Sequence, residues 1–419
     1  MSSSFASPIS IRLYNIAIVG LGLLLIWEFQ DLVKFHSMHL LPDGPSSDFS
    51  VYYYAAQRVL NNSASLYEFG ATLNLAGYTY PPLGVLLFAP FTLFDYHTAY
   101  ILFQFGSAIA LMGAIWCALD VRNRIFPQLP IDYSRSTFFA LLILASGPAF
   151  TTSVSGQVNS IVLVLCLGGI LMGMRGKPIV GGIMLAFACW IKIYPVLLVV
   201  AMLSIKSLRL TAFVSVMACV LLPVAMIPLV PLVLYEQYFL QLLPVMAGKV
   251  TSNLSNQSIT ATIIRFSVPV NQWSEWINVD VPSWIRALNG TILVGVMAMF
   301  SFTRISKFPD FLLVTLLSLA FIPLIAPLGW GHSYLFSMPL VAYCIVYCEQ
   351  MAIRVVAAVA WFLLLVPAYS ILSPLREFAT PVVEVLYFRY FIAVWAVILF
   401  ALAWVYNPKS LPIEGRSKC

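Results

Sequence analysis

The feature of this sequence that most constrains its fold is a succession of apolar runs close to the length of a membrane-crossing helix. A helix needs roughly 20 predominantly apolar residues to cross the hydrocarbon core of a bilayer. Such runs recur along the whole chain, in which 61% of the residues are hydrophobic and only 9% are charged. A soluble domain carries about 25% charged residues. We therefore expect an all-α polytopic membrane protein.

The same composition excludes several other classes of protein. The formal net charge of +6 comes from scattered loop residues and not from a basic face with interleaved aromatic residues, which argues against a nucleic-acid partner. Six of the seven cysteines fall inside apolar runs, without the spacing of a metal site or a disulfide framework. Cys419 is the last residue and makes no prenylation box. The apolar run after Arg12 has no cleavage site, so we expect a retained first helix.

The apolar runs predict twelve membrane segments with both termini in the cytoplasm. Ten runs have spanning character: Leu13 to Trp27, Thr98 to Leu119, Thr137 to Ser153, Val158 to Met174, Leu210 to Leu234, Ile285 to Phe302, Phe311 to Ala326, Ser333 to Tyr347, Val355 to Leu372 and Leu386 to Val405. The stretch from Pro178 to Ile205 is 28 residues long, too long for one comfortable span and too short for two. Basic pairs flank it on both sides, which predicts two half-helices that meet near Lys192 and Pro195.

Basic residues support this topology, because cytoplasmic loops of membrane proteins carry an excess of Lys and Arg. Most of the 22 basic residues then lie on or beside the cytoplasmic face. Eight basic residues lie outside or within the membrane instead: Lys34, Arg58, Lys192, Lys249, Arg265, Arg286, Arg376 and Arg389. Cations at such places are costly, so several of them are expected to have a functional role.

Two long loops are expected on the outer side, Glu28 to Tyr80 and Glu236 to Trp284, and together they carry most of the polar chemistry. We expect the whole chain, residues 1–419, to form a single transmembrane catalytic domain. Within the first loop, Phe49 to Leu60 is amphipathic and follows Ser46 and Ser47, which predicts a capped helix along the outer interface. The apolar run from Leu83 to Phe94 is too short for a span and predicts an interfacial or re-entrant piece. No internal repeat is visible, which argues against an inverted-repeat transporter.

Asp48 stands at the start of the predicted interfacial helix, close to the membrane. It has two interpretations. The acid either complements the helix dipole in the first turn or acts as a general base at a membrane-surface active site. One carboxylate suffices for a reaction with a phosphate leaving group, because phosphate departs without being protonated. Glycoside hydrolysis, by contrast, uses two carboxylates.

Other polar positions on the outer side are candidates for substrate binding. Tyr80 ends the rigid stretch from Tyr78 to Pro82, which either turns the loop back to the membrane or forms an aromatic wall with nearby tyrosines. Gln157 and Asn159 lie in a hairpin between helices, and Asn256 and Gln257 lie in the second outer loop. Amides near a membrane cap helices or contact substrate, and both interpretations remain open.

Three residues are candidates for holding a phosphate group. The predicted helix break places Lys192 at membrane depth, where an ammonium group needs an anionic partner. No acid lies in the neighbouring spans, so Asp48 or a ligand phosphate must supply the charge. Arg265 and His332 face the same side, although a lone histidine at a helix start is commonly just an interfacial residue.

Several familiar motifs are absent. The sequence has no Walker loop, dinucleotide fingerprint, HExxH, GxSxG or EF-hand pattern. No paired-aspartate motif for a divalent ion occurs, so we expect no cofactor and an activity independent of metal. A substrate for an outward-facing membrane enzyme would then be activated already and carried on a lipid.

The order of these motifs resembles that of a known family. The matching positions are Asp48-Phe49, Tyr53 to Ala56, Leu66-Tyr67, Tyr78 to Pro82, Gly156 to Asn159, Gly181 to Lys192 with Pro195, Asn256 to Ser258 with Arg265, and Trp330 with His332. From about residue 10 to 400, the chain is similar to the polyprenol-phosphate-mannose-dependent mannosyltransferases of glycosyltransferase family 87. The resemblance implies the GT-C membrane fold.

The resemblance also implies an activity: inverting transfer of a hexose, typically mannose, from a polyprenyl phosphate to an acceptor hydroxyl on the extracytoplasmic side. Asp48 matches the proposed base of the family, and His332 matches a residue near the donor phosphate. Lys192 and Arg265 are assigned to the phosphate from charge and depth. The chain departs from the family at Ser333, where a second histidine or a bulky polar residue is frequent.

The expected partners are a polyprenyl-phosphate sugar, a lipid or glycan acceptor and the lipids of the plasma or inner membrane. A transporter of lipid-linked sugars or solutes that uses the same cavity is the alternative from another class. A transferase of the same fold with a different lipid donor is a third possibility. The sequence does not distinguish mannose from arabinose or glucose, and it does not identify the acceptor or the linkage.

Overall fold

The computed structural model describes residues 8–39, 47–61, 66–67, 77–129, 131–269, 272–273, 275–302, 310–365 and 388–406. Residues 1–7 and 407–419 of the termini expected in the cytoplasm, and Arg376 in the last outer segment, lie outside these ranges. The same is true of the end of the span predicted from Val355 to Leu372.

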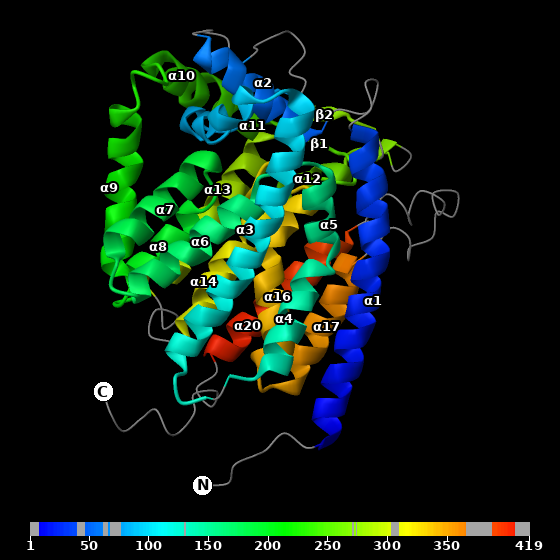
Figure 1. The fold of residues 1–419 in the computed structure, drawn as a ribbon. Coiled ribbons are helices and arrows are strands. Elements are labelled where there is room, and N and C mark those ends of the chain that lie inside the picture. The colour runs from blue at the N-terminus through cyan, green and yellow to red at the C-terminus, as the bar shows by residue number, and fades with distance from the viewer. Residues whose placement is uncertain are drawn as a thin grey trace.

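The described chain is almost entirely helical, with one pair of short strands (Figure 1). The first half contains α1 (Pro8–His39), α2 (Asp48–Leu60), the 3-10 helices η1 (Pro82–Leu87) and η2 (Ala89–Leu93), α3 (Tyr96–Ile125), α4 (Tyr133–Leu144), α5 (Gly147–Val154), α6 (Asn159–Met174), α7 (Pro178–Ile191), α8 (Val196–Ser204) and α9 (Arg209–Ala225). The second half contains α10 (Leu232–Glu236), the π-helix η3 (Gln237–Leu242), α11 (Leu243–Gly248), β1 (Lys249–Thr251), α12 (Ile259–Arg265), β2 (Asn278–Asp280), α13 (Ser283–Phe302), α14 (Phe311–Ala320), α15 (Ile322–Ile325), the 3-10 helix η6 (Gly331–Ser337), α16 (Met338–Tyr347), α17 (Met351–Leu365) and α20 (Arg389–Tyr406). This arrangement confirms the all-α fold class.

Four of the described helices are long and apolar enough to cross a membrane: Asn15–Met38 within α1, Tyr96–Ile125, Ser283–Ser301 and Arg389–Tyr406. The pair α4 and α5, bent by 51°, makes a fifth if it counts as one span. The other apolar helices are shorter, because turns interrupt them. The protein is thus a multi-pass membrane protein, while the number of twelve segments stays a prediction.

The predicted interruption between Pro178 and Ile205 is present. The helix α7 ends at Ile191 and α8 begins at Val196, so Lys192 lies in an extended turn between the two. Pro195 is the residue that precedes α8. It suits this place because a proline has no backbone N–H for the preceding turn to satisfy.

The short elements gather at one end of the helical bundle, at the top of Figure 1. There α2 begins at Asp48 as predicted, but the hydroxyl group of Ser47 does not cap it and lies 3.2 Å from the hydroxyl group of Tyr96. The run from Leu83 to Phe94 forms η1 and η2 and not a span. The strands β1 and β2 are antiparallel and pair Val250 with Val279. We call this end of the bundle the α2 end.

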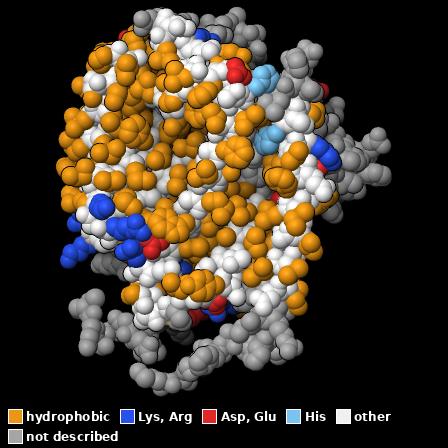
Figure 2. Space-filling view, in the orientation of Figure 1, with side chains coloured by type: hydrophobic (Ala, Val, Ile, Leu, Met, Phe, Trp, Pro, Cys, Tyr) orange, Lys and Arg blue, Asp and Glu red, His pale blue; other side chains and the backbone are white. Residues whose placement is uncertain are grey.

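The helix α3 runs from the α2 end to the opposite end of the bundle, where charged side chains gather (Figures 1 and 2). Asp120 near the end of α3 forms ion pairs with Arg124 at 3.2 Å and with Arg175 at 2.7 Å. Large apolar side chains are exposed between the two ends, such as Phe105 of α3 and Val294 of α13. An apolar band between two polar ends is the surface expected of a protein embedded in lipid.

Candidate active site

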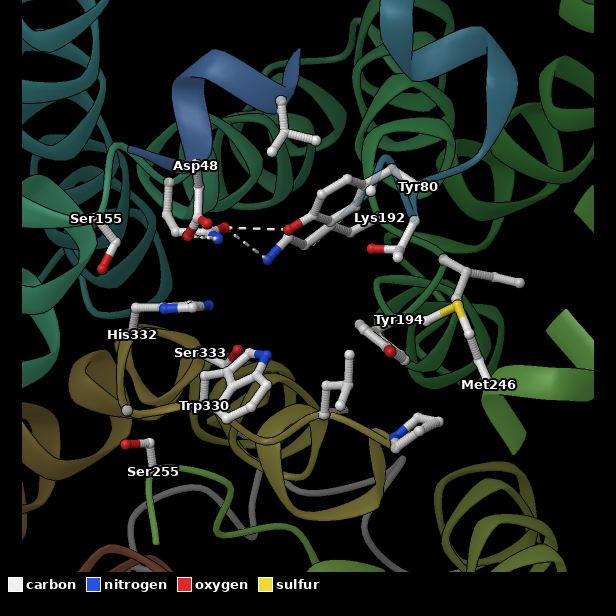
Figure 3. A pocket seen from close by; sticks show the side chains of 18 of the residues that line it. Asp48, Tyr80, Ser155, Lys192, Tyr194, Met246, Ser255, Trp330, His332 and Ser333 are labelled. Atoms are coloured by element: carbon white, nitrogen blue, oxygen red, sulfur yellow. Dashed lines mark hydrogen bonds between the residues drawn. The ribbon is translucent and has the colours of Figure 1, made fainter. Parts of the chain in front are cut away.

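A cavity of about 700 Å³ opens at the α2 end of the bundle. Its walls come from parts of the chain that are far apart in sequence. The lining residues used below are Asp48, Tyr52, Tyr80, Ser155, Gln157, Lys192, Ser255, Gln257, Trp276, Asn278, Trp330 and His332. Figure 3 shows Asp48 and Lys192 along one wall, with His332, Ser333 and Trp330 facing them. Ligand sites in proteins are usually concave, with a few convergent polar groups of this kind.

The turn between α5 and α6 positions Asp48. The backbone N–H of Asp48 donates a hydrogen bond of 2.9 Å to the carbonyl oxygen of Ser155. The neighbouring Gly156 has a φ of +67°, and a Cβ atom there would approach the Cβ of Phe49 to 3.1 Å. A glycine is favoured at such a φ and leaves room for α2 to lie directly on the turn. The partly buried carboxylate therefore stands at a fixed place on the cavity wall.

Gln157 connects the acid to the other polar groups of this wall. Its Nε2 donates to Oδ2 of Asp48 at 2.5 Å. Its Oε1 accepts hydrogen bonds from the hydroxyl groups of Tyr52 at 3.0 Å and Tyr80 at 3.1 Å and from Nζ of Lys192 at 3.4 Å. Burial raises the pKa of both tyrosines, so their hydroxyl groups stay protonated and donate at neutral pH. Both polar atoms of this amide are thus held in one orientation.

Lys192 projects from the break between α7 and α8 into the same wall. Its Nζ donates to Oδ1 of Asn159 at 2.6 Å and lies 5.2 Å from the centre of the Tyr80 ring. The side chain is buried, and the Asp48 carboxylate attracts it electrostatically. Its hydrogen-bonding partners are neutral amides, so Asp48 is joined to it through Gln157. A buried ammonium group held by neutral oxygens favours an anionic ligand nearby.

Asn159 supports the site from behind instead of lining it. Its Nδ2 donates to the carbonyl oxygen of His332 at 2.8 Å, and Thr152 donates to the same oxygen at 3.2 Å. Both ends of the Asn159 amide are therefore occupied by the protein. The arrangement fixes His332, which lines the cavity, relative to Lys192. The sequence brought Asn159 to this region, and its contact with substrate stays a prediction.

The second outer loop meets the turn before η6, which brings together two clusters that are far apart in sequence. Asn256 pairs with Trp330 in an isolated β-bridge, and its Oδ1 accepts a hydrogen bond of 2.8 Å from the N–H of Gly329. Asn256 does not line the cavity, whereas Gln257 does. A Cβ atom at Gly329 would lie 2.3 Å from the carbonyl oxygen of Pro323. Only glycine therefore allows this close approach.

Arg265 lies beneath this loop and not at the cavity. Its guanidinium donates to the carbonyl oxygen of Asn256 and lies 5.1 Å from the centre of the Phe388 ring. Burial lowers the pKa of Arg265 to about 10, so it stays charged at neutral pH. The sequence placed this cation on the outer side, but it does not reveal which face of α12 turns inward. From this position, Arg265 stabilises the backbone of the loop that contains Gln257.

Comparison with known proteins identifies the family. The sequence model of glycosyltransferase family 87 matches residues 78–327. The chain belongs to glycosyltransferase family 87. It is 23% identical, over 275 residues, to a protein of Mycobacterium tuberculosis described as a polyprenol-phosphate-mannose-dependent alpha-(1-2)-phosphatidylinositol pentamannoside mannosyltransferase. This match covers 64% of the chain and 58% of that relative.

Membership in this family, together with the apolar helices, supports a membrane glycosyltransferase. The matched range contains Tyr80, Gln157 and Lys192, but Asp48 and His332 lie outside it. The roles of those two residues therefore depend on the geometry of the cavity.

In this family 87 protein, the nearby tyrosines considered with Tyr80 as an aromatic wall include Tyr52, which lines the cavity. Tyr52 lies one helical turn after Asp48 and shares its side of α2. Tyr194, in the turn after Lys192, also lines the cavity and was not among the predicted site residues. Tyr67 stands behind the wall, where its hydroxyl group donates to the carbonyl oxygen of Tyr80 at 2.8 Å.

Replacing Gln157 by leucine is expected to lower kcat of sugar transfer by this family 87 protein by about 100-fold, because misplacing reactive groups by about 1 Å has effects of this size. The change removes the donor to Asp48 and the acceptor of Lys192 together, while the hydrophobic side chain keeps the volume. Steady-state transfer rates of the purified protein measure kcat and the KM for the donor separately. Gln104→Leu is the matched control, since Gln104 contacts Ser153 away from the cavity. Equal activities of the two variants would contradict the role of Gln157.

Proposed function

We propose that this protein transfers a hexose, in the first instance mannose, from a polyprenyl phosphate to an acceptor hydroxyl group with inversion, and that Asp48 is the general base. The proposal rests on one observation. At one wall of the cavity, the amide of Gln157 donates to the Asp48 carboxylate and accepts from the Lys192 ammonium, so that it holds both groups in place. A base and a cation within one cavity suit a reaction in which a hydroxyl group loses a proton while a phosphate leaves.

The chemistry requires little more than these groups. The acceptor oxygen attacks the anomeric carbon from the face opposite the phosphate, and its proton passes to Asp48. The bond between the anomeric carbon and the phosphate oxygen breaks, and polyprenyl phosphate leaves with the electron pair. Lys192 and His332 line the cavity where they would stabilise charge that develops on the leaving phosphate. Arg265 would act only indirectly, through the loop that it braces.

The name of the mycobacterial relative supports the choice of donor, because it specifies polyprenol-phosphate-mannose. The surroundings of the cavity suit a lipid-borne substrate. The exposed apolar side chains of the helices around it would lie in the bilayer, so a polyprenyl chain can reach the cavity sideways while its phosphate stays at the polar end.

The proposal places the cavity on the extracytoplasmic side and both termini in the cytoplasm. The ion-paired arginines Arg124 and Arg175 at the opposite end of the bundle support this orientation, because Lys and Arg accumulate on the cytoplasmic side. The whole chain, residues 1–419, is then one catalytic domain in the plasma or inner membrane. Its acceptor is a lipid or a glycan and not a nucleic acid.

The experiment that tests the proposal uses radiolabelled polyprenyl phosphomannose and membranes that contain or lack this protein. We expect a labelled product, separable from the donor by extraction and chromatography, in the first membranes only. A transporter of lipid-linked sugar would move the label across the membrane and form no new glycoside. Label transferred only from a donor with another sugar or lipid would point to a transferase of the same fold with a different substrate.

Removal of divalent ions is expected to leave the transfer rate unchanged, because Lys192 supplies the positive charge that a metal ion would otherwise provide and His332 can donate a hydrogen bond to the phosphate. The measurement is the rate of transfer in the presence of excess chelator, after dialysis against it. Loss of activity that returns on addition of Mg²⁺ or Mn²⁺ would show that a metal ion takes part.

A further inference from the structure

The cavity wall opposite Asp48 contains two tryptophans and three polar side chains that the mechanism above does not use. Trp276 and Trp330 line the cavity with their ring centres 5.3 Å apart, inclined at 48°. Ser255, Gln257 and Asn278 line the same side. We call these five residues the tryptophan wall. In Figure 3, Trp330 and Ser255 lie across the open space from Asp48.

The tryptophan wall is built on a rigid backbone. The N–H of Gln257 donates to the carbonyl oxygen of Gly329 at 2.8 Å, next to the bridge between Asn256 and Trp330. The N–H of Ser252 donates to the carbonyl oxygen of Ile277 at 3.0 Å, beside Trp276. These bonds join three separate segments of the chain. The backbone that carries the indole rings is thus held in place before any ligand arrives, which lowers the entropic cost of binding.

Gln257 offers a hydrogen-bond donor whose orientation is fixed. Its Oε1 accepts from the backbone N–H groups of Tyr390 at 2.9 Å and Phe391 at 3.2 Å, at the start of α20. The opposite end of the amide, Nε2, is buried and has no hydrogen-bond partner among the described residues. A buried donor without a partner is costly in a folded protein. A ligand oxygen in the cavity would satisfy it.

We propose that the tryptophan wall is the acceptor subsite and that it binds a sugar ring of the acceptor. The proposal rests on the proposed transferase function and narrows its acceptor to molecules that already carry a sugar. The C–H face of a sugar ring packs on the electron-rich face of an indole. Its hydroxyl groups meet the amide and hydroxyl groups of Gln257, Asn278 and Ser255. A ring held there presents a hydroxyl group to Asp48 across the cavity.

A bare alcohol or an acyl chain would use this wall poorly. A sugar ring has both an apolar C–H face, which can pack on an indole ring, and hydroxyl groups, which can bond to the neighbouring amides. An alcohol or an acyl chain does not combine the two. Interfacial tryptophans in membrane proteins commonly lie at the headgroup level without binding a ligand. Trp276 differs from these in that it contacts a second tryptophan and lines the same cavity as Asp48.

The test compares Trp276→Ala with Trp284→Ala in the full-length protein reconstituted in lipid nanodiscs. Both tryptophans are largely exposed, at 68% and 60%, so both variants are expected to fold. Trp284 is the matched control because it does not line the cavity. With octyl α-mannopyranoside as the acceptor probe, Trp276→Ala should raise the KM for the acceptor by about tenfold or more, as loss of a central tryptophan does at binding sites. The KM for the polyprenyl donor should stay unchanged, and Trp284→Ala should resemble the wild type.

An unchanged KM for the acceptor in Trp276→Ala, or a rise confined to the KM for the donor, would overturn the proposal. A second measurement does not require turnover. Saturation-transfer NMR with methyl α-mannopyranoside should show a signal for the wild type and for Trp284→Ala that is lost in Trp276→Ala. If that pattern holds but no transfer occurs from any donor, the tryptophan wall binds sugar and the proposed transfer is wrong. If transfer occurs and the NMR signal does not depend on Trp276, the transferase stands and the acceptor subsite is wrong.

Discussion

Asp48→Asn is expected to lower the rate of sugar transfer by a factor on the order of 10² to 10⁴, the usual contribution of a general base. Asparagine has nearly the same shape as aspartate, and its side-chain oxygen still accepts the hydrogen bond from Gln157. Folding and donor binding should therefore persist, because the substitution removes only the capacity to take the proton of the acceptor. The measurement is single-turnover transfer from radiolabelled polyprenyl phosphomannose, with donor binding determined separately by filtration.

The matched control is Asp95→Asn at the same end of the bundle. Asp95 is exposed, caps α3 through the N–H of Thr98 and does not line the cavity. Asparagine caps helices about as well as aspartate, so this variant should keep the activity of the wild type. Full activity of Asp48→Asn would exclude Asp48 as the base and leave the interpretation of a first-turn acid. A transporter would move the donor equally well in both variants.

Lys192→Met is expected to lower kcat/KM for the donor by about 10² to 10³, the effect seen when one group that stabilises developing negative charge is removed. Methionine keeps the length of the side chain and leaves the phosphate without its nearest cation at this wall. The free energy of unfolding should change little, because the variant loses hydrogen bonds but also removes the cost of a buried ammonium group whose hydrogen-bonding partners are neutral amides. Transfer rates at low donor concentration, together with the midpoint of thermal unfolding, separate the two effects.

Lys249→Met serves as the control for this variant. Lys249 is another cation of the α2 end, exposed at the start of β1 and outside the cavity of Asp48. Its replacement should leave kcat/KM unchanged. A comparable loss in both variants would mean that the general positive potential of this end attracts the donor, and that Lys192 has no specific place at the phosphate.

The candidate site was predictable where its parts are local. The start of α2 at Asp48 followed from the amphipathic pattern after two serines. The break at Lys192 followed from a segment too long for one span with basic pairs on both sides. Both are consequences of short-range rules, because helix ends and membrane depth are encoded within a few turns of the chain. The same rules predicted that Ser47 caps α2, but its hydroxyl group contacts that of Tyr96, which belongs to α3.

Which of the amide side chains line the cavity was not predictable from the sequence. Gln157 and Asn159 are two residues apart, yet one lines the cavity and the other supports His332 from behind. Asn256 and Gln257 are adjacent and show the same split. Arg265 was expected at a phosphate and instead donates to the backbone of the second outer loop. Each outcome depends on which side of a turn faces the cavity, and that is settled by packing between distant segments.

By itself, the sequence determined that the chain is helical and lies in a membrane, and it brought Asp48 and Lys192 to attention as candidate site residues. Apolar runs and sparse charges suffice for the fold class and the membrane location, because lipid tolerates only backbone that satisfies its own hydrogen bonds. The tertiary structure decided which polar side chains meet. Asp48, Gln157 and Lys192 come from three separate elements, and Trp276 and Trp330 come from two more. Contacts between residues so far apart arise only when the helices pack, and no local pattern in the chain records them.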